Sequence, residues 1–161
     1  MIVITRKGVA IMAVWGIGTF YKNPNGQGEP VTNKFIQNNC ACTGWEKEQA
    51  PTIHTLFNSI KINDVVYLKK FYIPRRRLTI LAVGIVTDTF DKIDSLGYGV
   101  SVKWIKSSIK NSNYIELSRE EARYNVYRNT IYQEYCNRVL DKVIAEIPND
   151  IKNQINIDKF A

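Results

Sequence analysis

Apolar runs bounded by turn-forming or charged residues recur along the chain, and they predict the strands of one sheet. The first run is continuous from Val9 to Trp15 and extends through a glycine-containing stretch to Tyr21, so one buried strand is expected there. Four further strands are expected over 40–45, 65–68, 78–86 and 99–105. The last three are predicted to be consecutive antiparallel strands, with a bend or bulge at Gly84.

Helices are indicated where apolar residues recur at spacings of three and four. One such stripe predicts a helix over 52–60, and a second predicts a helix over 131–147 that ends before Pro148. A short helix is also expected over 32–37. Residues 118–121, with the sequence Ser-Arg-Glu-Glu, form a capping box that starts a further helical segment.

The first predicted strand contains two glycines on one of its faces. In strand geometry Gly16 and Gly18 point to one side, while Trp15, Ile17 and Thr19 point to the other. One side of the strand therefore carries a notch without side chains. Two interpretations are open: close backbone packing or a bulge, and a floor on which a flat ligand rests.

Length and composition are typical of one globular domain. The 161 residues predict a single domain over 1–161, with a core from about 12 to 147 and a tail over 149–161 for which a last helical turn and disorder are both open. No apolar run approaches the roughly 20 residues that span a bilayer. Three cysteines cannot all pair, which favours a reducing compartment, and we expect a cytoplasmic protein that binds no membrane.

Several short motifs follow one another in an order that carries a family resemblance. They are Trp15-Gly16-Ile17-Gly18-Thr19-Phe20-Tyr21, Cys42-Thr43-Gly44-Trp45, Asn63-Asp64 before Val65-Val66-Tyr67-Leu68, Gly84-Ile85-Val86, and Val102-Lys103-Trp104. This order resembles the EVE-like branch of the PUA-like superfamily, whose relatives include YTH domains and the DNA-reading modules of some modification-dependent restriction systems. The resemblance covers roughly residues 12–135. The family more often has Gly-Asp where this chain has Asn63-Asp64, a mild departure because asparagine also tolerates turn geometry.

The resemblance implies an α+β fold of the PUA-like (EVE-like) type. Its mostly antiparallel curved sheet, or pseudo-barrel, has helices alongside it. The resemblance further implies a pocket in which aromatic and backbone groups hold a nucleobase flipped out of its strand, with no metal, no cofactor and no catalytic group. It leaves open which base is held, and whether the polymer is DNA or RNA.

A flipped base needs flat apolar faces for stacking and a few polar groups for its edge. The tryptophans are the first candidates for the faces, although a core position for Trp104 is the stronger alternative because its strand alternates inward at that point. We expect Trp15 and Trp45 to form the walls and the notch to form the floor. The complete candidate set is Trp15, Gly16, Ile17, Gly18, Trp45, Phe71, Trp104 and Arg128, with Phe71 or Arg128 at the mouth.

A formal net charge of +7 favours polyanionic partners, and one connection concentrates that charge. Between the strands at 65–68 and 78–86, cations are interleaved with Phe71 and Tyr72, which suits phosphate neutralisation and stacking. A solvated hairpin is the alternative. The residues expected to contact phosphates are Lys69, Lys70, Arg75, Arg76 and Arg77.

Residues typical of catalysis or metal binding do not form a convincing pattern in the sequence. His54 is expected on the surface, off the apolar stripe of its helix. The cysteines at 40, 42 and 136 lack the paired spacing of a zinc site, and Gly16-x-Gly18 lacks the third glycine of a dinucleotide-binding loop. Asp88, Asp91 and Asp94 are expected to be turn formers. We therefore expect no metal ligands and no enzyme.

The favoured function is a nucleic-acid-binding module that reads a modified or flipped base of DNA or RNA without catalysis of its own. Such a reader would act with an effector nuclease or helicase. A domain that senses a free nucleotide or other small molecule is the first alternative. A structural domain that binds a protein partner through its C-terminal helix is the second, and an enzyme comes last.

Overall fold

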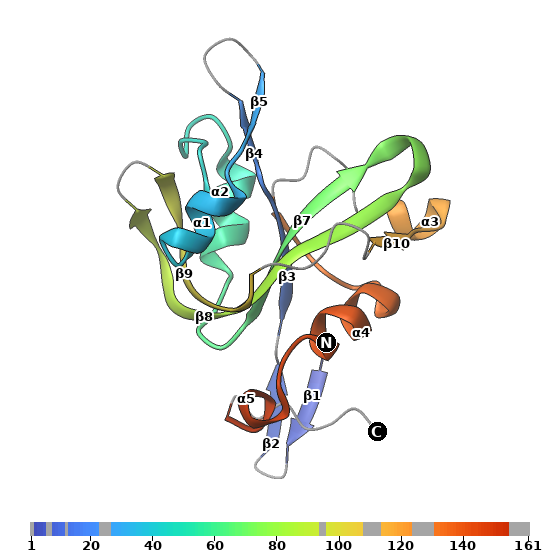
Figure 1. Cartoon of the computed structure of the whole chain (residues 1–161). Coiled ribbons are helices and arrows are strands. Elements are labelled where there is room, and N and C mark those ends of the chain that lie inside the picture. The colour runs from blue at the N-terminus through green and yellow to red at the C-terminus, as the bar shows by residue number, and fades with distance from the viewer. Residues whose placement is uncertain are drawn as a thin grey trace.

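The body of the molecule is a strongly curled sheet that forms half of a barrel (Figure 1). The computed structural model describes residues 2–5, 8–11, 13–22, 27–93, 96–107, 114–123 and 131–154. Within these ranges seven strands form the main sheet in the order β11-β3-β7-β8-β9-β6, and β10 pairs with β8 off this path. Their bounds are β3 Val14–Gly18, β6 Cys40–Thr43, β7 Val65–Tyr72, β8 Arg77–Ile93, β9 Gly97–Lys106, β10 Tyr114–Glu116 and β11 Ile131–Gln133.

The three central strands confirm the prediction made from the apolar runs. β7 pairs with β8 and β8 pairs with β9, both antiparallel and consecutive in the chain. The sheet is nevertheless mixed, because β3 lies parallel to β7, from Val14 opposite Val65 to Gly18 opposite Lys69. A parallel pair needs a long crossover. Here the crossover contains β6 and two helices, α1 (Thr32–Gln37) and α2 (Pro51–Asn58), both at about their predicted positions.

The curl of the sheet comes mainly from β8, which is 17 residues long. Its first part pairs with β7 and β10, and its second part pairs with β9. The register between β8 and β9 shifts three times, once between Val83 and Gly84, where a bend or bulge is predicted. Bulges of this kind bend a strand and increase its twist, so β8 wraps around the core instead of running straight.

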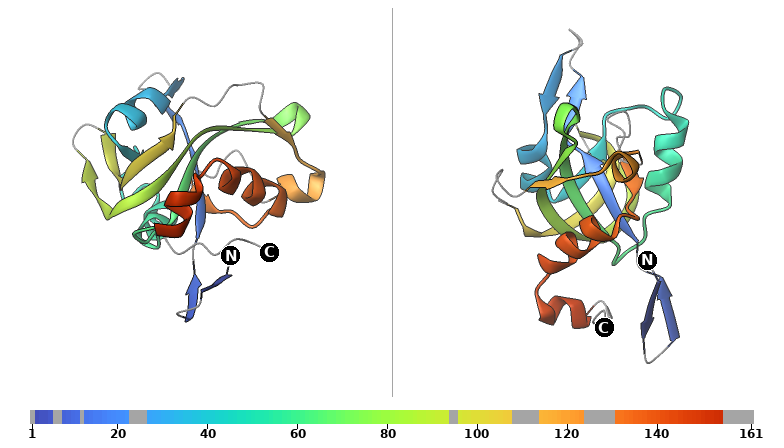
Figure 2. Two further views of the ribbon diagram at one scale, coloured as in Figure 1. Left: turned by 60° about the horizontal axis from the view of Figure 1, so that its bottom comes forward. Right: turned by 90° about the vertical axis from the view of Figure 1, so that its right-hand side faces the viewer.

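The central part of the sheet is buried on both faces, whereas the outer part of the β7–β8 hairpin and β10 is buried on one face only. The concave face packs against α1 and α2 around Trp15, Phe35 and Phe57. The other face carries Val65 and Tyr67 and packs against α4 (Asn137–Ala145), whose apolar stripe faces the sheet (Figure 2). Two short helices, α3 (Arg119–Ala122) and α5 (Asn149–Gln154), flank α4 in the chain.

The predicted single strand over 9–21 is wrong, because the chain forms three strands there. β2 (Gly8–Ile11) pairs with β1 (Ile2–Thr5) in a hairpin that projects from the body, and β4 (Phe20–Lys22) pairs with β5 (Gly28–Pro30) in another (Figures 1 and 2). β3 alone enters the main sheet. The chain leaves β3 at Thr19, whose carbonyl accepts from the Val31 amide and whose hydroxyl donates to the Lys69 carbonyl.

The predicted helix over 131–147 is wrong at its start. Residues 131–133 form β11, which pairs antiparallel with β3, and the helix begins only at Asn137. The capping box before α3 is confirmed, because the Ser118 hydroxyl accepts from the Glu121 amide and the Glu121 carboxylate accepts from the Ser118 amide. No helix in the described part of the chain has the length and apolar character that crossing a membrane requires.

Candidate nucleic-acid interface

The β7–β8 hairpin and β10 present one exposed face that combines cations with aromatic rings. Residues directly opposite each other in an antiparallel pair share a face. Lys70 lies opposite Thr79 and Tyr72 lies opposite Arg77. On the other side of β8, Tyr114 and Glu116 pair with the same two residues. We call this face the hairpin platform; its members are Lys70, Tyr72, Arg77, Thr79, Tyr114 and Glu116.

The opposite face of the same three strands anchors the platform to the body. Leu78 and Ile115 are buried there, and Phe71 packs against the same cluster, which includes the apolar face of α4. Phe71, predicted at the mouth of a pocket, is therefore turned away from the platform. Side chains alternate along β7, so Phe71 points toward the core while its neighbours Lys70 and Tyr72 point outward.

The cations on and beside the platform differ in whether they already contact other groups of the protein. Arg77 lies over the Tyr114 ring at 4.4 Å and donates from Nε to Glu116 Oε1 over 3.3 Å. Arg76 donates from Nε to the Leu117 carbonyl over 2.9 Å. Among the described residues, neither Lys70 nor Arg75 has a carboxylate oxygen within 4.0 Å. These two exposed cations are therefore the most available to a phosphate.

Of the three tryptophans, only Trp45 has a substantially exposed ring. Trp15 is 3% exposed, and its indole N–H donates to Asp64 Oδ2 over 3.0 Å. Trp104 packs against the concave core and donates to the Phe35 carbonyl over 3.1 Å. Trp45 is 41% exposed on the loop after β6. The expectation that Trp15 forms a wall of an open pocket is thus corrected: its ring is a core side chain with its polar edge satisfied.

The notch at Gly16 is filled. A Cβ atom at Gly16 would lie 2.7 Å from the Tyr67 hydroxyl oxygen and 3.0 Å from Cε1 of Tyr132. The glycine thus leaves room for two tyrosine rings, while Ile17, on the other side of the strand, is fully buried. Close packing is the interpretation that fits at Gly16, which does not offer an open floor to a flat ligand.

The rings that fill the notch belong to a buried polar cluster, formed by Tyr67, Lys69, Tyr132 and Glu134. The Tyr67 hydroxyl donates to Glu134 Oε1 over 2.8 Å, and the Tyr132 hydroxyl hydrogen-bonds to both groups. Lys69 places its ammonium 3.9 Å from the centre of the Tyr132 ring. Burial lowers the pKa of Lys69 to about 7, against the opposing effect of the Glu134 carboxylate, and burial raises the pKa of Glu134.

Lys69 is only 6% exposed, so its predicted contact with phosphates is corrected. The reason is that β7 is buried on both faces as far as Lys69, and alternation puts Lys69 on the face of Tyr67 and Phe71. Charge alone predicts this lysine on the surface, whereas the structure surrounds it with tyrosine rings and a carboxylate.

We expect the burial of Lys69 to make stability depend on pH. Its pKa is about 7 in the folded chain and near 10.5 when solvated, so between these values the unfolded chain binds more protons and stability rises with pH. Lys69→Met should remove a gain of roughly 2 kcal/mol in the free energy of unfolding between pH 7 and 9. Urea unfolding at several pH values measures this gain. The exposed neighbour provides the control: Lys70→Met should keep the wild-type profile, and equal profiles for all three proteins would contradict the prediction.

No family model matches the chain, and no curated protein matches its sequence. What the hairpin platform binds is therefore inferred from its own chemistry. Sequence reasoning missed Tyr114, because its pairing with Thr79 joins segments that no local pattern connects. Arg128, expected near the mouth of the pocket, lies outside the described residues.

His54 is buried, which corrects its predicted surface position. It is 4% exposed, its Nε2–H donates to the Trp45 carbonyl over 2.6 Å, and its ring packs beside Phe90 and Tyr98. Its role is to hold the loop that carries Trp45. The structure also places Cys40 and Cys42 in the core, and among the described residues no three His, Cys, Asp or Glu side chains are grouped to hold a metal ion.

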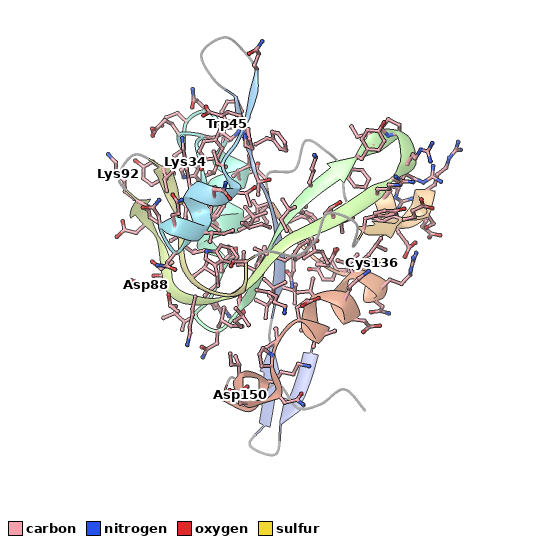
Figure 3. The ribbon with its side chains drawn as sticks, viewed as in Figure 1. Lys34, Trp45, Asp88, Lys92, Cys136 and Asp150 are labelled. Atoms are coloured by element: carbon pink, nitrogen blue, oxygen red, sulfur yellow. The ribbon has the colours of Figure 1, made fainter. Side chains whose placement is uncertain are left out.

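The carboxylates predicted in a polar loop lie on a strand instead. Asp88 and Asp91 belong to β8, where each accepts from the amide of the next residue, and Asp94 lies outside the described residues. Both aspartates stand where the β8–β9 register shifts. Figure 3 shows Asp88 and Lys92 at the end of β8 that is remote from the β7–β8 hairpin. Their hydrogen bonds stay within the irregular part of β8, and neither residue belongs to the hairpin platform.

A half-open cavity of about 310 Å³ lies where α3 meets the start of α4 (Figure 3, beside Cys136). Glu121 dominates it, accepting from the Ser118 amide and from Arg138 Nη1, both over 2.9 Å, and from the Cys136 thiol over 3.2 Å. These bonds, first among them the one from the Ser118 backbone, hold the pKa of Glu121 at about 2. Through these bonds the carboxylate connects α3 to α4, so we assign it a structural role.

Proposed function

We propose that the chain is a nucleic-acid-binding module of the PUA-like type and that the hairpin platform is its contact with the polymer. The observation that carries the proposal is the combination on one exposed face of Lys70 and Arg77 with Tyr72 and Tyr114. Cations attract the phosphate backbone, and the flat faces of tyrosine rings accept unstacked bases. The half-barrel with helices on both faces is compatible with a pseudo-barrel of this type.

Recognition of a modified or flipped base would use the exposed rings, in place of the buried Trp15. Tyr72 is 53% exposed and Tyr114 is 38% exposed, and Arg77 lies between their strands. Arg77 already lies against the Tyr114 ring, which fixes that ring with one face toward the cation. A base stacked on the platform gains roughly 1–3 kcal/mol from such rings, whichever base it is.

Charge reversal of the two available cations tests the proposal. For Lys70→Glu/Arg75→Glu we expect the affinity for a DNA oligonucleotide to fall roughly tenfold to a hundredfold at low salt, because about two phosphate contacts are lost. The slope of log affinity against log salt should become shallower by about 2. Titration by fluorescence anisotropy at several salt concentrations measures both quantities.

The matched control is Lys47→Glu/Lys61→Glu, which makes the same change of charge at exposed positions on either side of α2. This double variant should keep most of the affinity, and both double variants should melt at the wild-type temperature. Equal losses of affinity in the two would mean that net charge matters and the platform does not. If the wild-type protein binds no DNA or RNA oligonucleotide at low salt, the proposed function is wrong.

A further inference from the structure

The tip of the β7–β8 hairpin exposes apolar side chains between cations. Between the two strands lies one turn of 3₁₀ helix, Ile73–Arg75. Ile73 is 49% exposed, and Tyr72 before it is 53% exposed. Pro74, Arg75 and Arg76 are also exposed. Tyr72, Ile73 and Pro74 are adjacent and exposed at the end of a projecting hairpin, where they form one small apolar patch that suits contact with a partner.

The tip is held in one shape. Pro74 fixes its own φ, and the Arg76 amide closes the turn by donating to the Ile73 carbonyl over 3.1 Å. Arg76 has a φ of 48°, a left-handed conformation, and its guanidinium is tied to the Leu117 carbonyl beyond β10. Because the turn is braced in this way, inserting it into a partner would cost little ordering entropy.

We propose that this tip is a wedge that enters duplex DNA and unstacks one base step. Ile73 and Pro74 would insert between neighbouring base pairs, and Arg75 would contact the flanking phosphate. Apolar wedges of this kind are a recurrent way of kinking a duplex, and the unstacking they cause is repaid by wider contact with the protein. The inference rests on the proposed function and adds how a base becomes available: a step opened by the tip lies next to the rings of the platform.

Duplex DNA fits the hairpin better than duplex RNA does. The major groove of B-form DNA is about 12 Å wide and admits a two-stranded β-ribbon. The corresponding groove of an A-form RNA helix is deep and narrow, so side chains do not read it. A single strand has no base-paired step to open, so the wedge would have no function on it.

The experiment uses DNA duplexes that carry 2-aminopurine, whose fluorescence rises when it is unstacked. Binding of the wild-type protein should raise the fluorescence. For Ile73→Ser we expect this rise to disappear and the affinity for the duplex to fall about tenfold, with no change for single-stranded DNA of the same sequence. Ile73→Leu keeps an apolar wedge and should retain the rise. Ile62→Ser is the matched control, because Ile62 is 52% exposed in the turn before β7.

The outcomes separate the two proposals. If duplex DNA binds the platform without any rise in fluorescence, or if Ile73→Ser behaves like Ile62→Ser, the wedge is wrong and the proposed function stands. Preference for duplex RNA over duplex DNA also overturns the wedge. If no nucleic acid binds, both proposals fail. A melting temperature for each variant ensures that a loss of binding is not a loss of folding.

Discussion

Replacing Asp64 with alanine is expected to lower the free energy of unfolding by about 4 kcal/mol, since a buried carboxylate that accepts several hydrogen bonds is lost. Asp64 is 4% exposed. Its Oδ1 accepts from the Ala13 amide over 3.2 Å, and its Oδ2 accepts from the Trp15 indole over 3.0 Å and from the Lys61 amide over 2.9 Å. Alanine would leave three donors without a partner, two at the start of β3 and one in the turn before β7. Chemical unfolding followed by tryptophan fluorescence measures the loss.

Trp15→Phe provides the comparison for this prediction. Phenylalanine keeps a large ring in the core and removes only one of the three donors, so a smaller loss of about 1–2 kcal/mol is expected. If Asp64→Ala lowers the free energy of unfolding no more than Trp15→Phe does, the Asp64 carboxylate does not hold the turn before β7 to β3. The same site explains the Asn63-Asp64 pair: Asn63 has a φ of 73°, a conformation that glycine adopts more easily, and Asp64 then joins the end of the α2 turn to β3.

Gly99→Ala is the second change with a large expected effect, because the space for a side chain at this point is occupied by backbone. A Cβ at Gly99 would lie 2.2 Å from the Ala41 carbonyl oxygen and 2.7 Å from the Cys42 Cα. β6 would have to separate from β9, and we expect destabilisation by about 3 kcal/mol or more. Thermal and urea unfolding both report it.

Gly44→Ala distinguishes crowding by backbone from crowding by a side chain. A Cβ at Gly44 would lie 3.2 Å from the Tyr21 ring, which can move by a few tenths of an ångström. A loss below about 1 kcal/mol is expected at this exposed glycine. Similar losses at Gly99 and Gly44 would show that β6 and β9 are not as tightly paired as the structure has them.

Local patterns predicted the strands with a clear apolar run or a clear alternation, and failed where pairing is decided at long range. β7 and β8 were found because their cores are continuous apolar runs, and β9 was found because its apolar and polar residues alternate. The end of β8 was missed, since residues 87–93 are mostly polar and are strand only because they pair with β9. Residues 131–133 fit a helical stripe and still form β11, because the open edge of β3 offers them a partner.

The candidate site was predictable in composition and not in arrangement. Cations interleaved with aromatic residues pointed to the segment between β7 and β8, and the structure shows this segment as an exposed hairpin tip. Charge alone predicts Lys69 on the surface, but β7 is buried on both faces as far as this residue, and what covers those faces is not visible in a local pattern. The glycine notch was likewise visible, but the tyrosines that fill it come from β7 and β11, which only the folded sheet brings together.

The position of β3 between β7 and β11 has a consequence for the order in which the chain assembles. β3 meets β7 across about 50 residues of sequence and meets β11 across more than 110. Contacts of such separation are slow to form, whereas the β7–β8–β9 meander closes through short connections and can form early. During synthesis, the edge of β3 that pairs with β11 therefore stays uncovered until residues 131–133 have been made. An incomplete chain that stops before β11 would expose that edge to other strands, so its fate is aggregation or capture by a chaperone.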